Sequence, residues 1–285
     1  MSKLSFILPA KNEAAVIGSV IDRLHALQLD AEIIVVNDGS TDNTAEVAAN
    51  KGAKVITHPY SQGNGAAVRA GARAAQGEVL VFLDADGQHR PEDIPRLLAK
   101  LDEGYAMVVG ARTGLRSQAN VHRAVANRFY NRFGSWMVGH QILDLTSGFR
   151  AVKASVFRRF LYLLPNGFSY PTTITMCLFR SGFPVAYEPI EADKRVGKSH
   201  MRIFHDGIRF LLIIFKIGTL FSPLKLFMPC ALGFLLSGFA YYAYTFVNYH
   251  RFTNMSALLF IAAIVVFLIG LVSEQITALM YKDTE

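Results

Sequence analysis

The stretch VLVFLDADGQ, residues 79–88, decides the fold. Its five leading apolar residues predict a buried strand, and the acidic turn after them predicts where that strand ends. Asp84 and Asp86 lie two residues apart in this turn, so their carboxylates can converge on one divalent cation, and Gln88 can add a carbonyl oxygen. Oxygen ligands suit Mg²⁺ or Mn²⁺. The alternative, a solvated turn, is disfavoured by the apolar strand before it.

The sequence on either side of this stretch alternates between strand and helix patterns. Strands are expected at 4–9, 32–36, 54–57 and 79–83, and helices at 14–29, 42–51 and 65–76. This alternation predicts an α/β unit with a parallel sheet covered on both faces. Ligands of such sheets bind beyond the carboxyl ends of the strands. The polar residues that collect there are Lys11, Asn12, Glu13, Asp38, Asp84 and Asp86.

Composition and the absence of several motifs narrow the function classes. Of the 285 residues, 52% are hydrophobic and only 18% are charged, which excludes a disordered chain and a small disulfide scaffold. Cys177 and Cys230 are expected to be reduced thiols, and no zinc spacing or signal peptide is recognised. Two glycine-rich phosphate-binding motifs are absent. Val68 stands where the dinucleotide fingerprint GxGxxG requires its last glycine, and Ala192 stands where a P-loop requires its first. The net charge of +7 is explained more simply by a membrane surface than by nucleic acid, so no nucleic-acid partner is expected.

Two uncharged runs near the carboxyl end are long enough to cross a bilayer. They cover residues 226–249 and 252–273, and predict spans at about 224–249 and 252–275, joined by a tight turn. The alternative is a pair of buried core helices. Positive charge gathers before the first span, which predicts that residues 1–220 and the tail lie in the cytoplasm.

Residues 201–222 have a different pattern. Apolar residues recur at helical spacing with Arg202, Arg209 and Lys216 between them. This is typical of a basic amphipathic helix that lies in the membrane surface. An ordinary surface helix packed on its own domain is the alternative.

Seven motifs occur in a characteristic order: LPAKNE (8–13), VNDGSTD (36–42), NGAAVRAG (64–71), DADGQ (84–88), GAR (110–112), DLTSGFRA (144–151) and RVGKS (195–199). In this the chain resembles family 2 glycosyltransferases of the GT-A fold, and more narrowly the polyprenyl-phosphate glycosyltransferases. The resemblance implies an α/β, mixed GT-A sheet with helices on both faces at residues 1–200. An interfacial helix at 201–222 and a transmembrane hairpin at 223–285 would follow.

The resemblance also assigns roles to residues. Asp84, Asp86 and Gln88 would hold Mg²⁺ or Mn²⁺ on the donor diphosphate. Asp86, Arg112, Asp144 and Arg195 would be catalytic. The donor-binding residues would be Pro9, Lys11, Glu13, Asn37, Asp38, Asp84, Lys194 and Lys198. Two departures from the family pattern are Asn37, where Asp is common, and His200, where Lys is typical; they affect base preference and the identity of the phosphate ligand.

The implied reaction is transfer of a sugar, with inversion, from a UDP- or GDP-sugar to a polyprenyl phosphate. The enzyme would be integral to the cytoplasmic (inner) membrane with a cytosolic catalytic domain, and its hairpin offers a surface for forming a homo-oligomer. One alternative is a membrane-anchored enzyme that elongates a glycan or polysaccharide. Another is a non-catalytic membrane adaptor, which the intact Asp84, Asp86 and Arg112 argue against.

Overall fold

The structure is a computed structural model, and it describes residues 3–112, 121–167, 170–191, 215–216 and 218–281. Its contacts divide the chain into two compact units, Met1–Met201 and Arg202–Glu285, each treated by itself below. Residues 192–214 and 217 are outside the described residues. The division at 200 and 222 and the interfacial helix therefore stay predictions.

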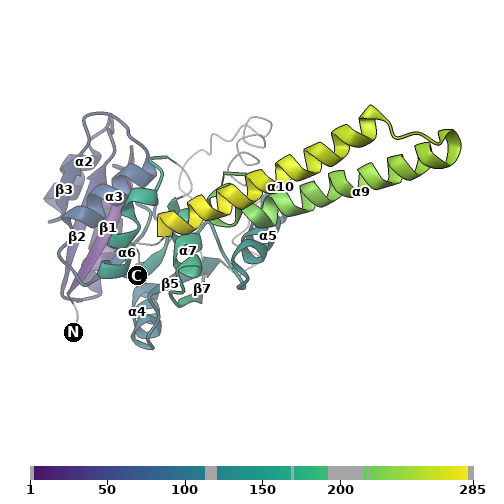
Figure 1. Cartoon of the computed structure of the whole chain (residues 1–285). Helices are drawn as coiled ribbons and strands as arrows, with labels where there is room; N and C mark the ends of the chain where they lie inside the picture. The colour runs from purple at the N-terminus through teal and green to yellow at the C-terminus, as the bar shows by residue number, and fades with distance from the viewer. Residues whose placement is uncertain (1–2, 113–120, 168–169, 192–214, 217, 282–285) are drawn as a thin grey trace. The chain divides into compact units, whose positions relative to one another are not determined.

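The first unit is built on a seven-stranded sheet in the order β3-β2-β1-β4-β6-β5-β7 (Figure 1). The strands are β1 Leu4–Ala10, β2 Ala31–Asn37, β3 Lys54–Thr57, β4 Val79–Phe82, β5 Met107–Arg112, β6 Arg150–Lys153 and β7 Val185–Ile190. β1 to β4 pair in parallel, and β7 is parallel to β5, but β6 is antiparallel to both β4 and β5. The four strands predicted from the alternation are parallel, as predicted, and the mixed sheet implied by the resemblance is confirmed by the antiparallel β6.

Helices cover both faces of the sheet. They are α1 Ile17–Ala26, α2 Thr44–Asn50, α3 Asn64–Ala74, α4 Ile94–Asp102, α5 Val121–Val138, α6 Ala154–Arg159 and α7 Tyr170–Arg180, with short 3-10 turns at Pro91–Asp93 and Leu161–Leu163. The strands and helices predicted up to residue 83 are all present, with ends shifted by up to three residues. Strands β5 to β7 are not among the predicted ones.

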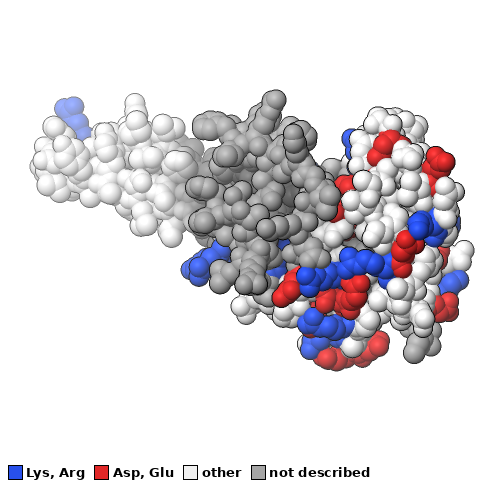
Figure 2. Space-filling model, turned by 180° about the vertical axis from the view of Figure 1, so that it is seen from behind, with Lys and Arg blue, Asp and Glu red and all other residues white. Residues whose placement is uncertain are grey.

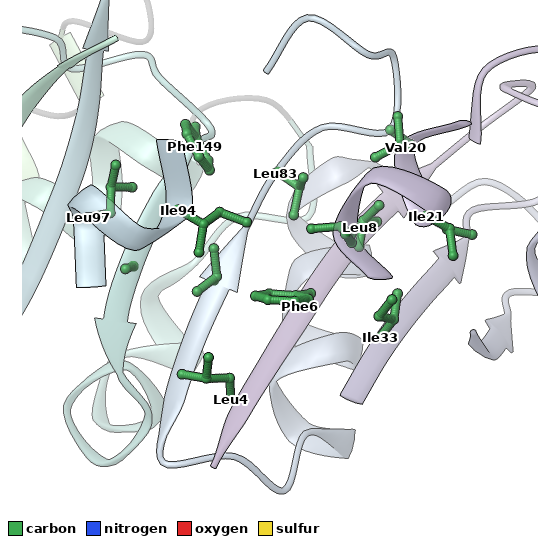
Figure 3. Close-up of a cluster of buried hydrophobic side chains, with 14 of the residues drawn as sticks. Leu4, Phe6, Leu8, Val20, Ile21, Ile33, Leu83, Ile94, Leu97 and Phe149 are labelled. Atoms are coloured by element: carbon green, nitrogen blue, oxygen red, sulfur yellow. The ribbon is translucent and has the colours of Figure 1, made fainter. Parts of the chain in front are cut away.

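The main core lies between the sheet and helices α1 and α4. Phe6 and Leu8 of β1 meet Ile21 of α1 on one side and Ile94 and Leu97 of α4 on the other (Figure 3). These positions follow the period of two along a strand and the 3.6-residue period along a helix. On the opposite face α3 packs closely, because the Cα of Gly71 leaves no room for a side chain against Ile7. The rigid sheet fixes the ends of its strands, where the polar residues lie.

The second unit contains two long apolar helices, α9 Pro223–Tyr249 and α10 Asn254–Tyr281. By length and composition both could cross a membrane, and few of their residues are buried, which disfavours the core-helix alternative. They pack on each other, with Gly238 of α9 against Phe260 of α10. Their surface in Figure 2 is almost free of charged side chains, whereas both charges are scattered over the first unit. The predicted pair of spans therefore has the helices it requires.

Candidate active site

Asp84 and Asp86 lie in the turn that follows β4, at the carboxyl end of the parallel strands. The Asp84 side chain is 38% exposed, although the strand before it is fully buried. The Gln88 amide donates to Oδ1 of Asp86 at 3.1 Å, and Gly87, at a φ of +73°, allows this tight turn. The apolar strand thus presents two partly exposed carboxylates on a fixed backbone.

Gly148 allows the Asp84 carboxylate to lie directly against the chain. A Cβ at position 148 would lie 2.9 Å from Oδ2 and 3.1 Å from Oδ1 of Asp84. Both distances are shorter than ordinary van der Waals contact. The DLTSGF segment, 60 residues further along the chain, is therefore one wall of the Asp84 site.

His89 supports the same turn from the buried side. The Asp84 amide donates to its Nδ1 at 3.3 Å, and its ring stacks on Phe149 with centroids 5.2 Å apart. Burial lowers the pKa of His89 and outweighs the nearby carboxylates, so the ring is neutral with Nδ1 as acceptor. Asp84, Asp86, Arg112 and Asp144 all act electrostatically on this ring. The fold therefore gathers these four predicted residues around one histidine that the sequence analysis did not single out.

Arg112 and Asp144 form a two-pronged ion pair. Nε of Arg112 donates to Oδ2 of Asp144 at 2.8 Å, and Nη2 donates to Oδ1 at 3.0 Å. The carboxylate also accepts from the backbone amides of Thr146 and Ser147, each at 3.0 Å. Burial alone would raise the pKa of Asp144, but the Arg112 hydrogen bonds and charge hold it below its ordinary value. Asp144 thus orients the guanidinium and has little capacity left to act as a base.

A second arginine, Arg150, is fully buried behind this segment. It donates to the carbonyl oxygens of Ser147 and, at 3.0 Å, of Pro171, while the Tyr170 hydroxyl donates to the Gly148 carbonyl at 3.2 Å. Burial lowers the pKa of Arg150. Within the described residues its Nε, Oγ of Ser147 and the hydroxyl of Tyr187 lack a hydrogen-bond partner. Arg150 and Tyr170 hold the backbone on which Asp84 rests, a function the sequence did not reveal.

Asp38, which follows β2, is held by hydrogen bonds from neighbouring residues of the protein. Its carboxylate accepts four hydrogen bonds, from His58 at 2.8 Å, the Ser61 hydroxyl at 2.8 Å, and the amides of Gln62 and Gly63 at 2.8 and 2.9 Å. Burial alone would raise its pKa, but these bonds lower it to about 2. Asp38 lies at the predicted edge of the sheet, and its contacts favour shaping the loop 58–63 over binding a base directly.

The loop after β1 is joined to the loop after β2. The Asn12 side chain accepts from the Thr41 amide at 2.8 Å, and the Glu13 amide donates to Thr44 Oγ1 at 2.9 Å. Asn37 is buried and accepts from the Ser40 amide at 3.1 Å, whereas Lys11 is exposed. The predicted donor-binding residues Pro9, Lys11, Glu13, Asn37 and Asp38 thus lie on two adjoining strand ends. Lys194, Arg195 and Lys198 lie outside the described residues.

The residues around Asp84 offer oxygen ligands, and their chemistry shows whether they fit a divalent metal. Among the described residues no cluster of three or more His, Cys, Asp and Glu side chains forms a metal site. Asp84 and Asp86, with the Gln88 amide oxygen, offer hard oxygen donors of the kind Mg²⁺ and Mn²⁺ take when waters and substrate phosphates complete the shell. The residues present fit a metal that is shared with a phosphate ligand.

Comparison with known proteins gives two family matches. Residues 5–162 match the family described as glycosyl transferase family 2, and residues 222–279 match the GtrB C-terminal hairpin. The first match covers more than half of the chain. The GT-A interpretation of the sheet and the membrane interpretation of the hairpin thus have support independent of the geometry.

Individual relatives agree with these matches. The chain is 29% identical over 216 residues to a dolichyl-phosphate hexose transferase of Haloferax volcanii, covering 75% of this chain and 93% of the relative. It is 30% identical over 210 residues to a polyprenol monophosphomannose synthase of Mycolicibacterium smegmatis, covering 68% and 79%. Among solved structures, glucosyl-3-phosphoglycerate synthase from Mycobacterium tuberculosis with UDP has a TM-score of 0.62 at 25% identity, covering 76% and 80%. A second structure of that enzyme, with Mn²⁺, UDP and glucosyl-3-phosphoglycerate, has a TM-score of 0.58 at 26% identity, covering 75% and 80%.

Proposed function

The chain belongs to glycosyl transferase family 2, and we propose that it transfers a sugar from a UDP- or GDP-sugar to a polyprenyl phosphate. It is a glycosyltransferase by this membership. The observation that carries the choice of acceptor is the combination, in one chain, of the strand-end carboxylates Asp84 and Asp86 with two helices long and apolar enough to cross a membrane. An acceptor with a long hydrocarbon tail stays in the bilayer, so an enzyme that uses it gains from being anchored there.

Two further findings support this acceptor. One relative described above is named a dolichyl-phosphate hexose transferase and the other a polyprenol monophosphomannose synthase, and both names refer to a phosphate lipid of the polyprenol type. The match to the GtrB C-terminal hairpin covers residues 222–279, which follow the glycosyl transferase family 2 match along the chain and include both apolar helices almost entirely. The excess of positive charge before α9 supports a cytosolic catalytic domain in the cytoplasmic membrane.

The donor would bind at the strand ends. Pro9, Lys11, Glu13, Asn37 and Asp38 would line the nucleoside pocket, with Asp38 holding the loop 58–63 in shape. Asp84, Asp86 and Gln88 would hold Mg²⁺ or Mn²⁺, which supplies Lewis-acid stabilisation of the leaving diphosphate. The Mn²⁺ and UDP in the structures of the Mycobacterium tuberculosis enzyme support this for the donor side.

The acceptor needs positioning more than activation. Its nucleophile is a phosphate oxygen that is mostly ionised at neutral pH, so no strong general base is required. One new bond forms between this oxygen and the anomeric carbon, and the bond from that carbon to the diphosphate breaks, with inversion. Arg112, oriented by Asp144, would bind the acceptor phosphate together with Arg195, Lys194 or Lys198. Alignment and charge neutralisation of two anions would supply most of the rate.

The proposal is tested with the full-length chain in detergent. The assay contains Mn²⁺ or Mg²⁺, a short-chain polyprenyl phosphate and a panel of radiolabelled UDP- and GDP-sugars, and it counts label extracted with lipid. We expect label in the lipid fraction with one donor, and its loss on chelation of the metal. Asp84→Asn should remove most of the label, and its matched control is Glu103→Gln, a change at an exposed carboxylate just after α4 that should leave the activity unchanged.

The same assay separates the alternatives. Label transferred to an added glycan, without lipid label, would show an enzyme that elongates polysaccharides. Label transferred to neither acceptor with any donor of the panel, in a folded protein, would contradict the proposed reaction.

A further inference from the structure

The loop of residues 58–63, between β3 and α3, lies at the strand ends where the donor is proposed to bind. The His58 amide donates to the Asn37 carbonyl at 2.9 Å, and the Asp38 amide donates to the Ala10 carbonyl at 2.9 Å. These bonds join the ends of β1, β2 and β3 in one row. Because β3 is the edge strand of the sheet, the β3–α3 loop, as we call residues 58–63, forms the last wall of this row.

The backbone of the β3–α3 loop is fixed from two sides. On one side it surrounds the Asp38 carboxylate, and all four hydrogen bonds that this carboxylate accepts come from the loop. Gly39, at a φ of +64°, allows a close approach there, since a Cβ would lie 2.6 Å from the Ser61 nitrogen. On the other side, a Cβ at Gly63 would lie 2.5 Å from the Asn166 carbonyl oxygen. The loop is therefore held in place before any ligand arrives.

This fixed loop carries an exposed aromatic side chain. Tyr60 is 69% exposed, the largest exposed fraction among the large apolar side chains that the structure describes in the first unit. A tyrosine ring has only two side-chain torsions, so on a fixed backbone it loses little conformational freedom when a ligand covers it. The edge on which the loop lies is the one where ligands of parallel sheets bind. Tyr60 thus has both the position and the support of a ligand contact.

The polar residues beside Tyr60 offer a nucleobase few contacts of their own. Asn37 and Asp38 are 5% and 4% exposed, and the Asn37 side chain already accepts from the Ser40 amide at 3.1 Å. Lys11, on the loop after β1, is exposed but supplies charge. A nucleobase also has two flat faces, which are favourably covered by an aromatic ring. Next to these polar residues, Tyr60 is the side chain that offers such a ring.

We propose that the Tyr60 ring stacks on the base of the nucleoside diphosphate donor. This rests on the proposed function, whose donor site lies at these strand ends, and it adds the residue that contacts the base. Because every base has a π face, the stacking supports UDP and GDP alike. The base is remote from the anomeric carbon, so the contact is the same in the ground state and the transition state. Its loss should raise the donor KM and leave kcat unchanged. The alternative is a tyrosine that is exposed singly and contacts no ligand, as is common on protein surfaces.

Calorimetry of UDP and of GDP, each with Mn²⁺, tests the proposal on the full-length chain in detergent. For the nucleotide that the wild type binds, we expect Tyr60→Ala to raise the Kd about 10-fold. Tyr60→Phe should stay within about 2-fold of wild type, because stacking does not need the hydroxyl. Since the side chain is exposed, the Tm of both variants should remain near that of the wild type. The matched control is Tyr162→Ala, which removes a 58% exposed tyrosine from the turn Leu161–Leu163, after α6.

Fluorescence reads the same contact directly. Trp136 is the only tryptophan of the chain, so Tyr60→Trp combined with Trp136→Phe places the single indole in the β3–α3 loop. UDP or GDP with Mn²⁺ should quench its emission and protect it from iodide. In Tyr162→Trp combined with Trp136→Phe, the same nucleotide should change neither the emission nor its quenching by iodide.

The proposal is overturned if Tyr60→Ala binds the nucleotide as tightly as the wild type, or if the indole stays open to iodide once nucleotide is bound. It is also overturned if Tyr60→Phe loses as much affinity as Tyr60→Ala, because the hydroxyl then makes the contact. None of these readouts depends on sugar transfer. Stacking alone fails if nucleotide binds without regard to Tyr60. Weakened binding in Tyr60→Ala, with no lipid label in the transfer assay, would contradict the acceptor and keep the stacking. If the wild type binds neither nucleotide, the donor site fails and the stacking with it.

Discussion

Four aspartates at the same edge of the sheet divide into two pairs with opposite environments. Asp84 and Asp86 follow β4 in a partly exposed turn. Asp38 and Asp144 are buried, and each accepts at least four hydrogen bonds from its own protein. All four follow the rule that polar residues collect at strand ends, but only the first pair is left accessible to a ligand.

The difference teaches how to assign roles within such a cluster. A carboxylate whose acceptor sites are filled by the protein orients its partners and stabilises the fold. One that stays partly exposed on a fixed backbone can bind a metal or a substrate. Mutations should therefore separate the pairs: changes in the first pair should cost activity while stability is kept, whereas changes in the second pair should also cost stability.

The largest effect is expected for Asp84→Asn or Asp86→Asn. Each change removes a charged metal ligand, and several kcal/mol of charge stabilisation at 1.36 kcal/mol per tenfold correspond to a loss of at least about 10³ in kcat/KM. Because the side chains are partly exposed, the free energy of unfolding should change by less than about 0.5 kcal/mol. The measurement is lipid-extractable product with Mn²⁺, together with a urea denaturation curve. If both variants retained their activity, the assignment of Asp84 and Asp86 as the ligand-binding pair would be wrong.

Next comes Asp144→Ala, which leaves Arg112 without its carboxylate. Breaking a buried pair costs about 3–5 kcal/mol, and we expect about 3 kcal/mol because the Arg112 side chain is 28% exposed. Denaturation of the full-length protein in detergent measures this. The double variant Asp144→Ala with Arg112→Met should recover part of the stability but no activity. If the double variant is no more stable than Asp144→Ala alone, the pair is not the source of the loss.

The contrast also shows what the sequence could predict. The β4 strand and its acidic turn follow from local patterns, and so does the position of Asp38 after β2. The antiparallel direction of β6 does not, because the four residues Arg150–Lys153 carry no signal for strand direction. Direction and neighbours are decided by long-range packing, which a single sequence does not display.

The ion pair of the site and its buried arginine could not be predicted from the sequence either. Arg112 and Asp144 are 32 residues apart, and their ion pair exists only because β5 and the segment before β6 meet in the sheet. An arginine such as Arg150 is expected at the surface, yet it is fully buried and donates to the carbonyl oxygen of Pro171 in α7. The role of Gly148 is visible only once the Asp84 carboxylate lies against it.

A smaller effect concerns Asp38 and pH. Its pKa of about 2 in the folded protein lies below the ordinary 3.8, so folding favours the charged form. The resulting stabilisation, about 2 kcal/mol, is fully present above about pH 4 and is lost as the pH falls toward 2. Asp38→Asn should flatten the dependence of unfolding free energy on pH between these values. Equal slopes in wild type and variant would place the acid sensitivity elsewhere.

The smallest effect is expected for Gly148→Ala. This variant tests the comparison of the two aspartate pairs most directly, because it moves Asp84 without changing its charge. The new Cβ would lie 2.9 Å from Oδ2 of Asp84, which must move. Because the end of a partly exposed side chain can shift easily, stability should hardly change, but the carboxylate would leave the position set for the metal. Changes in the support of a metal ligand typically cost 10–100-fold, and we expect about 10-fold in kcat/KM, with a raised Mn²⁺ requirement. Gly167→Ala is the matched control, since no atom of the described residues lies within 4 Å of a Cβ there. If Gly148→Ala instead unfolds the protein while its remaining activity per folded molecule is unchanged, the segment serves the fold alone, and Asp84 would belong with the buried pair.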